Sequence, residues 1–273
     1  MNKSILIIGF GKMGHLYSKY LTELNIRWTY HDPFVPGGLK KLTSLNKYSH
    51  IIISTPPENH HEVYKLIVEL GFKGYVYIDK PVIVKDEHFD ILDEVNVFCG
   101  MTERFNPAIK ALKNLLNLDE LTSIKFSRYS TVPDNMNVPV LFDLGVHDLD
   151  LYLYLLGFKE CPLEYNVFEK ERTCYIMAKQ HDILSIFEWS HDSQKRERKI
   201  TILQKDVVYE ADLIDQTILF YGPGQVCRNL YVDKAQPLKQ VLKAFLNNEK
   251  CFAKLSHEFM LAVMQVKWNK DPI

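Results

Sequence analysis

A glycine-rich segment near the N-terminus most constrains how this chain can fold. Gly9, Gly11 and Gly14 lie in the sequence GFGKMG, directly after the apolar run Ser4–Ile8. That β-branched run predicts a buried strand, and apolar residues recurring at helical spacing over 13–24 predict a helix after the glycines. The first glycine of such a turn makes it tight, and the third lets the helix pack closely on the strand. The segment therefore predicts the first turn of a βαβ unit.

The pattern G-x-G-x-x-G in this context also predicts a dinucleotide site. The second glycine lets the backbone approach a diphosphate, which the free N–H groups and the dipole of the helix start attract. Asp32 ends the next predicted strand, where its carboxylate can accept hydrogen bonds from ribose hydroxyls and repel a 2′-phosphate. This favours NAD, although Lys40 and Lys41 nearby keep NADP open, and a purely structural turn is the alternative. The predicted cofactor-binding residues here are Gly9, Phe10, Gly11, Lys12, Met13, Gly14 and Asp32.

Strand and helix patterns alternate through the first half of the chain. Continuous apolar strands between amphipathic helices indicate a parallel sheet covered on both faces, an α/β arrangement. We therefore expect residues 1–118 to form a Rossmann dinucleotide-binding domain. The predicted strands are Ser4–Ile8, Arg27–His31, Ile51–Thr55, Tyr75–Ile78 and Val95–Met101, and the predicted helices are 13–24, 58–70 and 86–94.

The alternation of strand and helix patterns ends at about residue 120. Clustered strand-like runs after one helix predict that residues 119–273 form a second, α+β domain with a largely antiparallel sheet. The final helices could pack back on the first domain. The predicted helices are 142–156, 238–246 and 257–267, and the predicted strands are 164–169, 174–179, 184–189, 199–203 and 207–211.

Composition excludes several classes of partner. Lys and Arg (33) nearly cancel Asp and Glu (34), which gives no electrostatic case for nucleic acid or an anionic membrane. The apolar runs are too short to span a bilayer. The five cysteines are scattered without a C-x-x-C pair, which argues against a zinc module and a disulfide framework and suits a reducing cytoplasm. No metal-ligand spacing is present, so we expect no metal and a cytoplasmic location.

The third and fourth predicted strands end in residues that could face a cofactor. Prolines stop the third strand at the carboxyl edge of the sheet, where open α/β folds bind ligands, so Ser54, Thr55 and Pro56 could flank the cofactor. His60 could line the same cleft or be a polar residue at a helix start. The fourth strand ends in Asp79-Lys80-Pro81. Lys80, fixed by the following proline, could face the cleft or be an ordinary surface lysine.

Two further segments carry candidate substrate residues. Arg104, in TERFNP, could anchor a substrate or form an ion pair that joins domains. Asp143 and His147, in DLGVHDLD, are spaced to share one face of a helix, with Asp150 about one turn later. Gly145 within this helix costs about 1 kcal/mol relative to alanine, which is easiest to explain if something must approach the helix closely. The alternative is an amphipathic helix with a solvated polar face.

Taken in order, GFGKMG, DKP, RFNP and DLGVHDLD resemble the signatures of the Gfo/Idh/MocA family, the glucose–fructose oxidoreductase and inositol dehydrogenase group. Asp79 stands where that family usually has Glu. The resemblance implies a Rossmann domain followed by an α/β domain with an open-faced sheet. Many members associate through that sheet face, which implies a homo-oligomer, a dimer or a tetramer. The chain is short for the family, with only a brief connection, Thr131–Leu141, where substrate loops often lie.

The family's usual activity is NAD(P)-dependent transfer of a hydride to or from a carbon of a sugar, cyclitol or sugar nucleotide. The resemblance implies that Lys80 lies beside the reacting oxygen, His147 is the acid/base and Asp143 orients substrate and lysine. A histidine can exchange a proton near neutral pH, and an ammonium group stabilises developing alkoxide charge. Lys80, Arg104, Asp143 and His147 are therefore the predicted substrate-binding residues.

Three alternatives remain open at this point. One is a non-catalytic nucleotide-sensing or regulatory protein on the same fold, which the retention of Lys80, Asp143 and His147 disfavours. Another is an NAD-dependent glycosidase, which oxidises its substrate transiently and shows no net redox change. The third is an imine or enone reductase. The sequence does not identify the substrate, the reacting carbon or the direction of the reaction.

Overall fold

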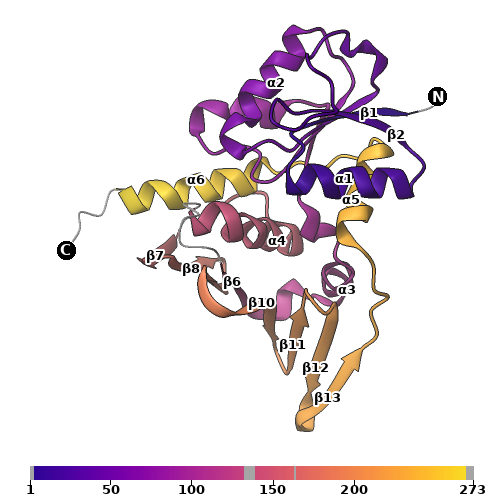
Figure 1. Ribbon diagram of the computed structural model, residues 1–273. Helices are drawn as coiled ribbons and strands as arrows, with labels where there is room; N and C mark the ends of the chain where they lie inside the picture. Colours follow the sequence, from indigo (N-terminus) through magenta and orange to yellow (C-terminus); the bar gives the residue numbers. More distant parts are fainter. Residues whose placement is uncertain (1–2, 132–138, 163, 269–273) are drawn as a thin grey trace. The chain divides into compact units, whose positions relative to one another are not determined.

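The computed structural model describes residues 3–131, 139–162 and 164–268 (Figure 1). The chain divides into two compact units. The first comprises Met1–Met101 and Leu238–Lys254, and the second comprises Thr102–Pro237 and Leu255–Ile273. The division after Met101 differs from the predicted boundary at residue 118. Residues after 101 belong to the second unit because they bind to it: the Asn106 side-chain amide donates a 2.8 Å hydrogen bond to the carbonyl of Leu213, which directly follows β11.

The first unit is built on a five-stranded parallel sheet in the order β2-β1-β3-β4-β5, which confirms the predicted Rossmann-like domain. Strands β1, β3, β4 and β5 are mainly apolar and buried, as expected when helices cover both faces, whereas the edge strand β2 is only partly buried. Helices α1 and α2 lie on opposite sides of this sheet in Figure 1. The elements are β1 (Ser4–Ile8), α1 (Lys12–Glu23), β2 (Arg27–His31), β3 (His50–Ile53), α2 (His60–Glu69), β4 (Tyr75–Ile78), the 3-10 helix η3 (Asp86–Asp93) and β5 (Val97–Cys99).

A late segment of the chain completes this first unit. Helix α5 (Pro237–Leu246) buries Phe245, whose ring makes edge contacts with His50, Tyr77 and Phe98 on three neighbouring strands. Each ring centroid lies within 5.7 Å of the Phe245 centroid. Strands near the N-terminus therefore depend for part of their cover on residues more than half the chain away.

The second unit contains an eight-stranded sheet in the order β13-β12-β11-β10-β6-β9-β8-β7. Its pairs are antiparallel except β6 with β9, so the predicted largely antiparallel sheet is confirmed. The central strand β6 and the last two strands at one end of the sheet, β12 and β13, were not predicted. The elements are α3 (Pro107–Leu115), β6 (Leu121–Thr131), α4 (Val146–Leu156), β7 (Glu164–Lys170), β8 (Thr173–Gln180), β9 (Ile183–Ser190), β10 (Asp192–Gln204), β11 (Val207–Asp212), β12 (Thr217–Gly222), β13 (Val226–Leu230) and α6 (Lys254–Trp268).

The two faces of this second sheet differ. On one face, the buried ring of Phe187 on β9 meets Tyr152 of α4 and Phe259 of α6, so these helices cover the sheet. The other face exposes several large apolar side chains. These are Phe168 (56% exposed), Tyr175, Met177 and Leu184, on β7, β8 and β9. The sheet is thus open on one side, as the family resemblance implied.

Candidate functional site

The three glycines of the N-terminal turn have three different surroundings. Gly9 has φ +91°, and a Cβ there would lie 2.6 Å from the backbone N of Thr55. A Cβ on Gly14 would lie 2.4 Å from the Gly9 carbonyl oxygen, so helix α1 could not pack on β1 as it does. Gly11, by contrast, has open space around its Cβ position within the described part of the chain. The first and third glycines are needed for the fold, and the second leaves bare backbone at the helix start.

The start of α1 is suited to an anion. Gly11 is its N-cap, and among the described residues no side chain caps the first N–H groups. An uncapped helix N-terminus with an accessible backbone is the arrangement that binds a phosphate in nucleotide-binding βαβ units. The residues present therefore fit the diphosphate of a dinucleotide.

Asp32 is held against this turn by backbone hydrogen bonds. Its Oδ2 accepts from Phe10 N at 2.7 Å, and its Oδ1 accepts from Phe34 N at 2.8 Å. Partial burial acts to raise the pKa of Asp32, but the N–H groups of Phe10, Phe34 and Val35 hold it below its ordinary value. The carboxylate is therefore ionised at neutral pH and fixed beside the glycine turn.

The other predicted residues of the turn contribute in different ways. The Phe10 side chain is buried and stacks on Tyr30 with 3.8 Å between ring centroids, so only its backbone is offered to a ligand. Lys12 and Met13 lie in the first turn of α1, where Lys12 is exposed. Sequence reasoning did not identify the packing role of Phe10, because the aromatic residues that surround it lie on β2.

The end of β3 lies beside the same turn. Ser54 Oγ donates a 2.8 Å hydrogen bond to the Gly9 carbonyl, and Pro56 is exposed. Thr55 Oγ1 is buried, and within the described ranges it has no hydrogen-bond partner. A buried hydroxyl without a partner is uncommon and costs free energy unless a ligand or water satisfies it. Thr55 is thus a second point at which the residues present fit a polar ligand.

His60 has a structural environment. It is buried, with one ring nitrogen 2.9 Å from the Thr55 carbonyl and the other 3.0 Å from the Pro81 carbonyl. Burial lowers the pKa of His60, although Asp79 and these carbonyls act to raise it. The ring bridges the ends of β3 and β4, which favours the helix-start alternative over a direct part in the cleft.

Asp79 is turned toward its own backbone. Its Oδ1 accepts a 2.9 Å hydrogen bond from Lys80 N, and its carboxyl group hydrogen-bonds the buried Tyr17 hydroxyl. Burial raises the pKa of Asp79 despite these contacts and the nearby charges of His60 and Lys80. The Lys80-Pro81 peptide is cis. The short carboxylate thus fixes the position of the Lys80 backbone from within the first unit.

The segment DLGVHDLD does not form one uniform α-helix. Residues Leu141–Gly145 form a π-helical turn, η6, and α4 follows at Val146. Asp143 lies in the π turn and His147 in the first turn of α4, so the α-helical spacing assumed from sequence does not apply between them. Single π turns within helices occur frequently at functional sites. Lys80 belongs to the first unit and Asp143 and His147 to the second, and their part in one site remains a prediction.

A residue outside every predicted motif contacts Asp143. His191 Nε2 lies 3.1 Å from Asp143 Oδ2, and the His191 side chain is only 1% exposed. His191 follows β9 directly and is separated from Trp189 by one residue. Alternation along a strand would have placed both on one side, but the sequence alone gave no reason to connect them with Asp143.

Trp189 explains Gly145. A Cβ on Gly145 would lie 2.8 Å from Leu141 Cδ1 of the same segment and 3.1 Å from the Trp189 ring, so the indole is the group from outside this segment that approaches the glycine closely. The Trp189 Nε1–H donates a 2.9 Å hydrogen bond to Asp148 Oδ2. The glycine therefore serves packing between the helix and β9.

Arg104 is engaged in an ion pair within the second unit. Its Nε and Nη2 donate to the two carboxylate oxygens of Asp150 at 2.7 and 2.5 Å, and Ser256 Oγ donates to the same carboxylate at 2.9 Å. A two-point guanidinium–carboxylate contact fixes the side chain strongly. This favours the ion-pair interpretation, although the pair joins parts of one unit.

A buried charge network links Asp148 of α4 to charged residues of two strands and of the 3-10 turn Thr102–Phe105. Arg128 donates to Asp148 at 2.7 Å and to Glu103 at 3.0 Å, and Arg198 donates to Glu103 at 2.8 Å. Burial acts to raise the pKa of Glu103, but the two guanidinium groups hold it below its ordinary value. Asp148 and Asp150 of the predicted motif therefore belong to structural ion pairs.

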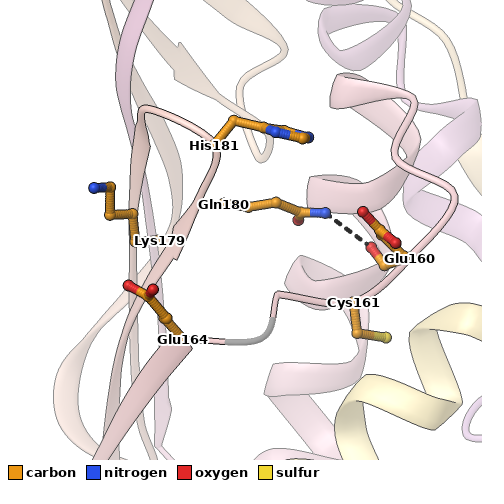
Figure 2. A pocket seen from close by; sticks show the side chains of 6 residues that line it. All are labelled: Glu160, Cys161, Glu164, Lys179, Gln180 and His181. Carbon is orange, nitrogen blue, oxygen red and sulfur yellow. Dashed lines mark hydrogen bonds between the residues drawn. The ribbon is translucent and has the colours of Figure 1, made fainter.

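A pocket of about 230 Å³ lies elsewhere in the second unit (Figure 2). The Gln180 amide at its floor donates to the Glu160 carbonyl and accepts from the Tyr152 hydroxyl, so it is structurally engaged. None of the predicted site residues lines this pocket. Its lining residues are Glu160, Cys161, Glu164, Lys179, Gln180 and His181.

No protein-family model matches this sequence, and no curated protein matches it. Among the residues that the structure describes, no helix is long and apolar enough to cross a membrane. Part of the connection Thr131–Leu141 lies outside the described residues.

Solved structures resemble the whole chain. UDP-N-acetylglucosamine 3-dehydrogenase GnnA from Acidithiobacillus ferrooxidans is 18% identical with a TM-score of 0.82, over 98% of this chain and 97% of that one. The dehydrogenase MviM from Clostridium difficile is 18% identical with a TM-score of 0.78, over 99% and 100%. An NAD binding oxidoreductase from Klebsiella pneumoniae is 14% identical with a TM-score of 0.76, over 98% of each chain. The chain is therefore not shortened relative to these proteins, and it shares the two-domain fold of structures named as dehydrogenases and oxidoreductases.

Proposed function

We propose that this protein is an NAD(P)-dependent oxidoreductase that prefers NAD. The observation that carries the proposal is the turn at the start of α1, where Gly11 leaves bare backbone and Asp32 is bound to Phe10 N at 2.7 Å. The helix N-terminus would hold the diphosphate, and Asp32 would accept hydrogen bonds from the adenosine ribose. An ionised carboxylate at that position opposes a 2′-phosphate. Thr55 Oγ1 would gain a polar partner from the bound cofactor.

The bound nicotinamide supplies hydride transfer, and the chain supplies binding, orientation and proton movement. His147 would take the hydroxyl proton of the substrate during oxidation or return it during reduction. The Lys80 ammonium would stabilise negative charge on the reacting oxygen, and Asp143 would orient substrate and lysine. Asp79 supports this role of Lys80 because it binds the Lys80 backbone N–H at 2.9 Å.

The substrate class we propose is a sugar, a cyclitol or a sugar nucleotide, with reaction at a carbinol or carbonyl carbon. The ordered motifs support membership of the Gfo/Idh/MocA family, which acts on such compounds. The likeness to a UDP-N-acetylglucosamine 3-dehydrogenase at a TM-score of 0.82 makes sugar nucleotides the first compounds to test.

The test is to mix the protein with NAD or NADP and a panel of sugars, cyclitols and sugar nucleotides, and to follow reduced nicotinamide by absorbance. We expect turnover with NAD, and loss of turnover in His147→Ala and Lys80→Met. His181→Ala, at an exposed histidine of a β-turn, is the matched control and keeps full activity. Absence of turnover on every compound, or equal rates in His147→Ala and the wild type, contradicts the proposal. Release of sugar without net reduction would identify a glycosidase instead.

We also propose that the protein forms a homo-oligomer through the open face of the second sheet. The apolar side chains of Phe168, Tyr175 and Met177 are 41 to 56% exposed there on paired strands. Contiguous exposed apolar surface commonly marks an interface. Replacing all three with Ser should yield monomers in light-scattering measurements of molar mass. A wild-type protein that is itself monomeric at micromolar concentration contradicts the proposal.

A further inference from the structure

A buried histidine lies behind the Asp143 carboxylate. His191 Nε2 is 3.1 Å from Asp143 Oδ2. An ionised carboxylate can only accept hydrogen bonds, so Nε2 carries the proton and donates it. We propose that His191 is a positioning residue that fixes the orientation of Asp143 for the reaction. This inference rests on the proposed function, in which Asp143 contacts the reacting group.

The exposures of the two side chains suit this role. The His191 side chain is 1% exposed, whereas that of Asp143 is 32% exposed. The donor thus approaches the carboxylate from the protein interior, and the carboxylate keeps surface that a ligand can reach.

The backbone that carries His191 is well fixed. His191 N donates a 3.0 Å hydrogen bond to the Arg172 carbonyl. The neighbouring Ser190 Oγ lies 2.8 Å from Thr173 Oγ1 and accepts from Asp192 N at 3.1 Å. These bonds fix the backbone from which the imidazole extends, and the burial of the ring, which is 1% exposed, restricts its rotation away from Asp143. A rigid donor is what orientation of a catalytic carboxylate requires.

Loss of this donor would remove a hydrogen bond that restrains the orientation of the carboxylate. Misplacement of a reacting group by about 1 Å can lower a rate by roughly 100-fold. His191→Phe keeps a planar ring of similar size and removes the N–H donor. His191→Gln keeps an N–H donor on a shorter group. The pair therefore separates the hydrogen bond from the volume of the side chain.

The experiment compares wild type, His191→Phe and His191→Gln with the substrate found in the panel above, and measures kcat, KM, NADH binding by fluorescence and thermal unfolding. We expect His191→Phe to lower kcat by about 10- to 100-fold while NADH affinity stays within about twofold. We expect His191→Gln to recover most of kcat. Tyr152→Phe, which removes a different buried hydrogen bond from α4, is the matched control and should change stability but not kcat.

The outcomes separate this inference from the proposed function. A folded His191→Phe with kcat within about threefold of wild type overturns the positioning role and leaves the function intact. The positioning role is also overturned, and the proposed function left intact, if folded His191→Gln is as slow as His191→Phe or if neither variant folds. A wild type that binds NADH but turns over no compound overturns the proposed function, and this inference with it.

Discussion

The glycine turn of the first unit and the DLGVHDLD segment of the second are built by different means. The turn is held by groups near it in the sequence or on the adjacent parallel strand: Gly14 packs on the Gly9 carbonyl, and Asp32 accepts a hydrogen bond from Phe10 N. The DLGVHDLD segment is held by side chains from distant strands, among them Arg128, Trp189 and His191. Backbone geometry therefore secures the first, and buried charges and rings secure the second. Substitutions should have correspondingly different effects.

Arg128→Met tests the second region and should have the largest effect. Removing the guanidinium leaves the carboxylates of Asp148 and Glu103 buried without it, which we expect to lower the free energy of unfolding by about 3–5 kcal/mol. Urea unfolding measures this. Lys195→Met, at a lysine that is 68% exposed and pairs with Glu197, is the control and should lower the midpoint far less. Equal effects of the two substitutions would show that charge burial does not hold this region.

Gly14→Ala tests the packing of the glycine turn. The new Cβ would meet the Gly9 carbonyl oxygen at 2.4 Å, a backbone atom that cannot move without displacing β1 or α1. Overpacking of this kind costs about 1–3 kcal/mol, so both thermal stability and NAD affinity should fall. Unchanged stability by calorimetry would mean that the helix does not need this close approach.

Gly11→Ala should separate binding from folding at the same turn. Its Cβ position is open, so we expect a thermal midpoint close to that of wild type. The methyl group would occupy space that a diphosphate needs, and NAD affinity should fall by about tenfold or more, as isothermal titration calorimetry can measure. NAD binding equal to that of wild type would argue against the predicted diphosphate position.

Asp79→Asn should have the smallest effect, and it depends on pH. The raised pKa of Asp79 means that the folded state favours the protonated carboxyl group. Below the ordinary value of 3.8 the wild type and the variant should be about equally stable. As the pH rises from there through the folded pKa, the wild type loses stability relative to Asp79→Asn, and the difference then stays constant. Urea unfolding at several pH values would show it, and a difference of the opposite sign would contradict the assigned burial effect.

The region held by local contacts could be predicted from the sequence better than the region held by long-range contacts. The strands Ser4–Ile8 and Tyr75–Ile78 could be predicted to the residue, because strands of a sheet that helices cover are nearly continuous apolar runs. Arg27–His31 could also be predicted to the residue, from its aromatic and β-branched residues before Asp32-Pro33, although it is only partly buried. Strand β6 could not, since its sequence LTSIKFSRYST mixes polar and buried residues on a half-exposed sheet. The central position of β6 follows from its pairing with β9 and β10, which no local pattern encodes.

The candidate site shows the same limit. Gly9, Gly11, Gly14 and Asp32 form a local pattern with a known spacing, so their arrangement could be predicted. The attachment of Arg104 to Asp150 and the contact of His191 with Asp143 join residues far apart in the chain. Such contacts arise only when strands and helices pack together.

The return of residues 238–254 to the first unit has a consequence for synthesis of the chain. Residues 1–101 leave the ribosome first, yet Tyr77 and Phe98 receive the Phe245 ring only after the whole second sheet has been translated. Domains commonly fold as units as the chain emerges, the N-terminal one first. Here part of the sheet of the first unit stays uncovered until Phe245 has been translated, so this unit is completed only after most of the second unit has emerged.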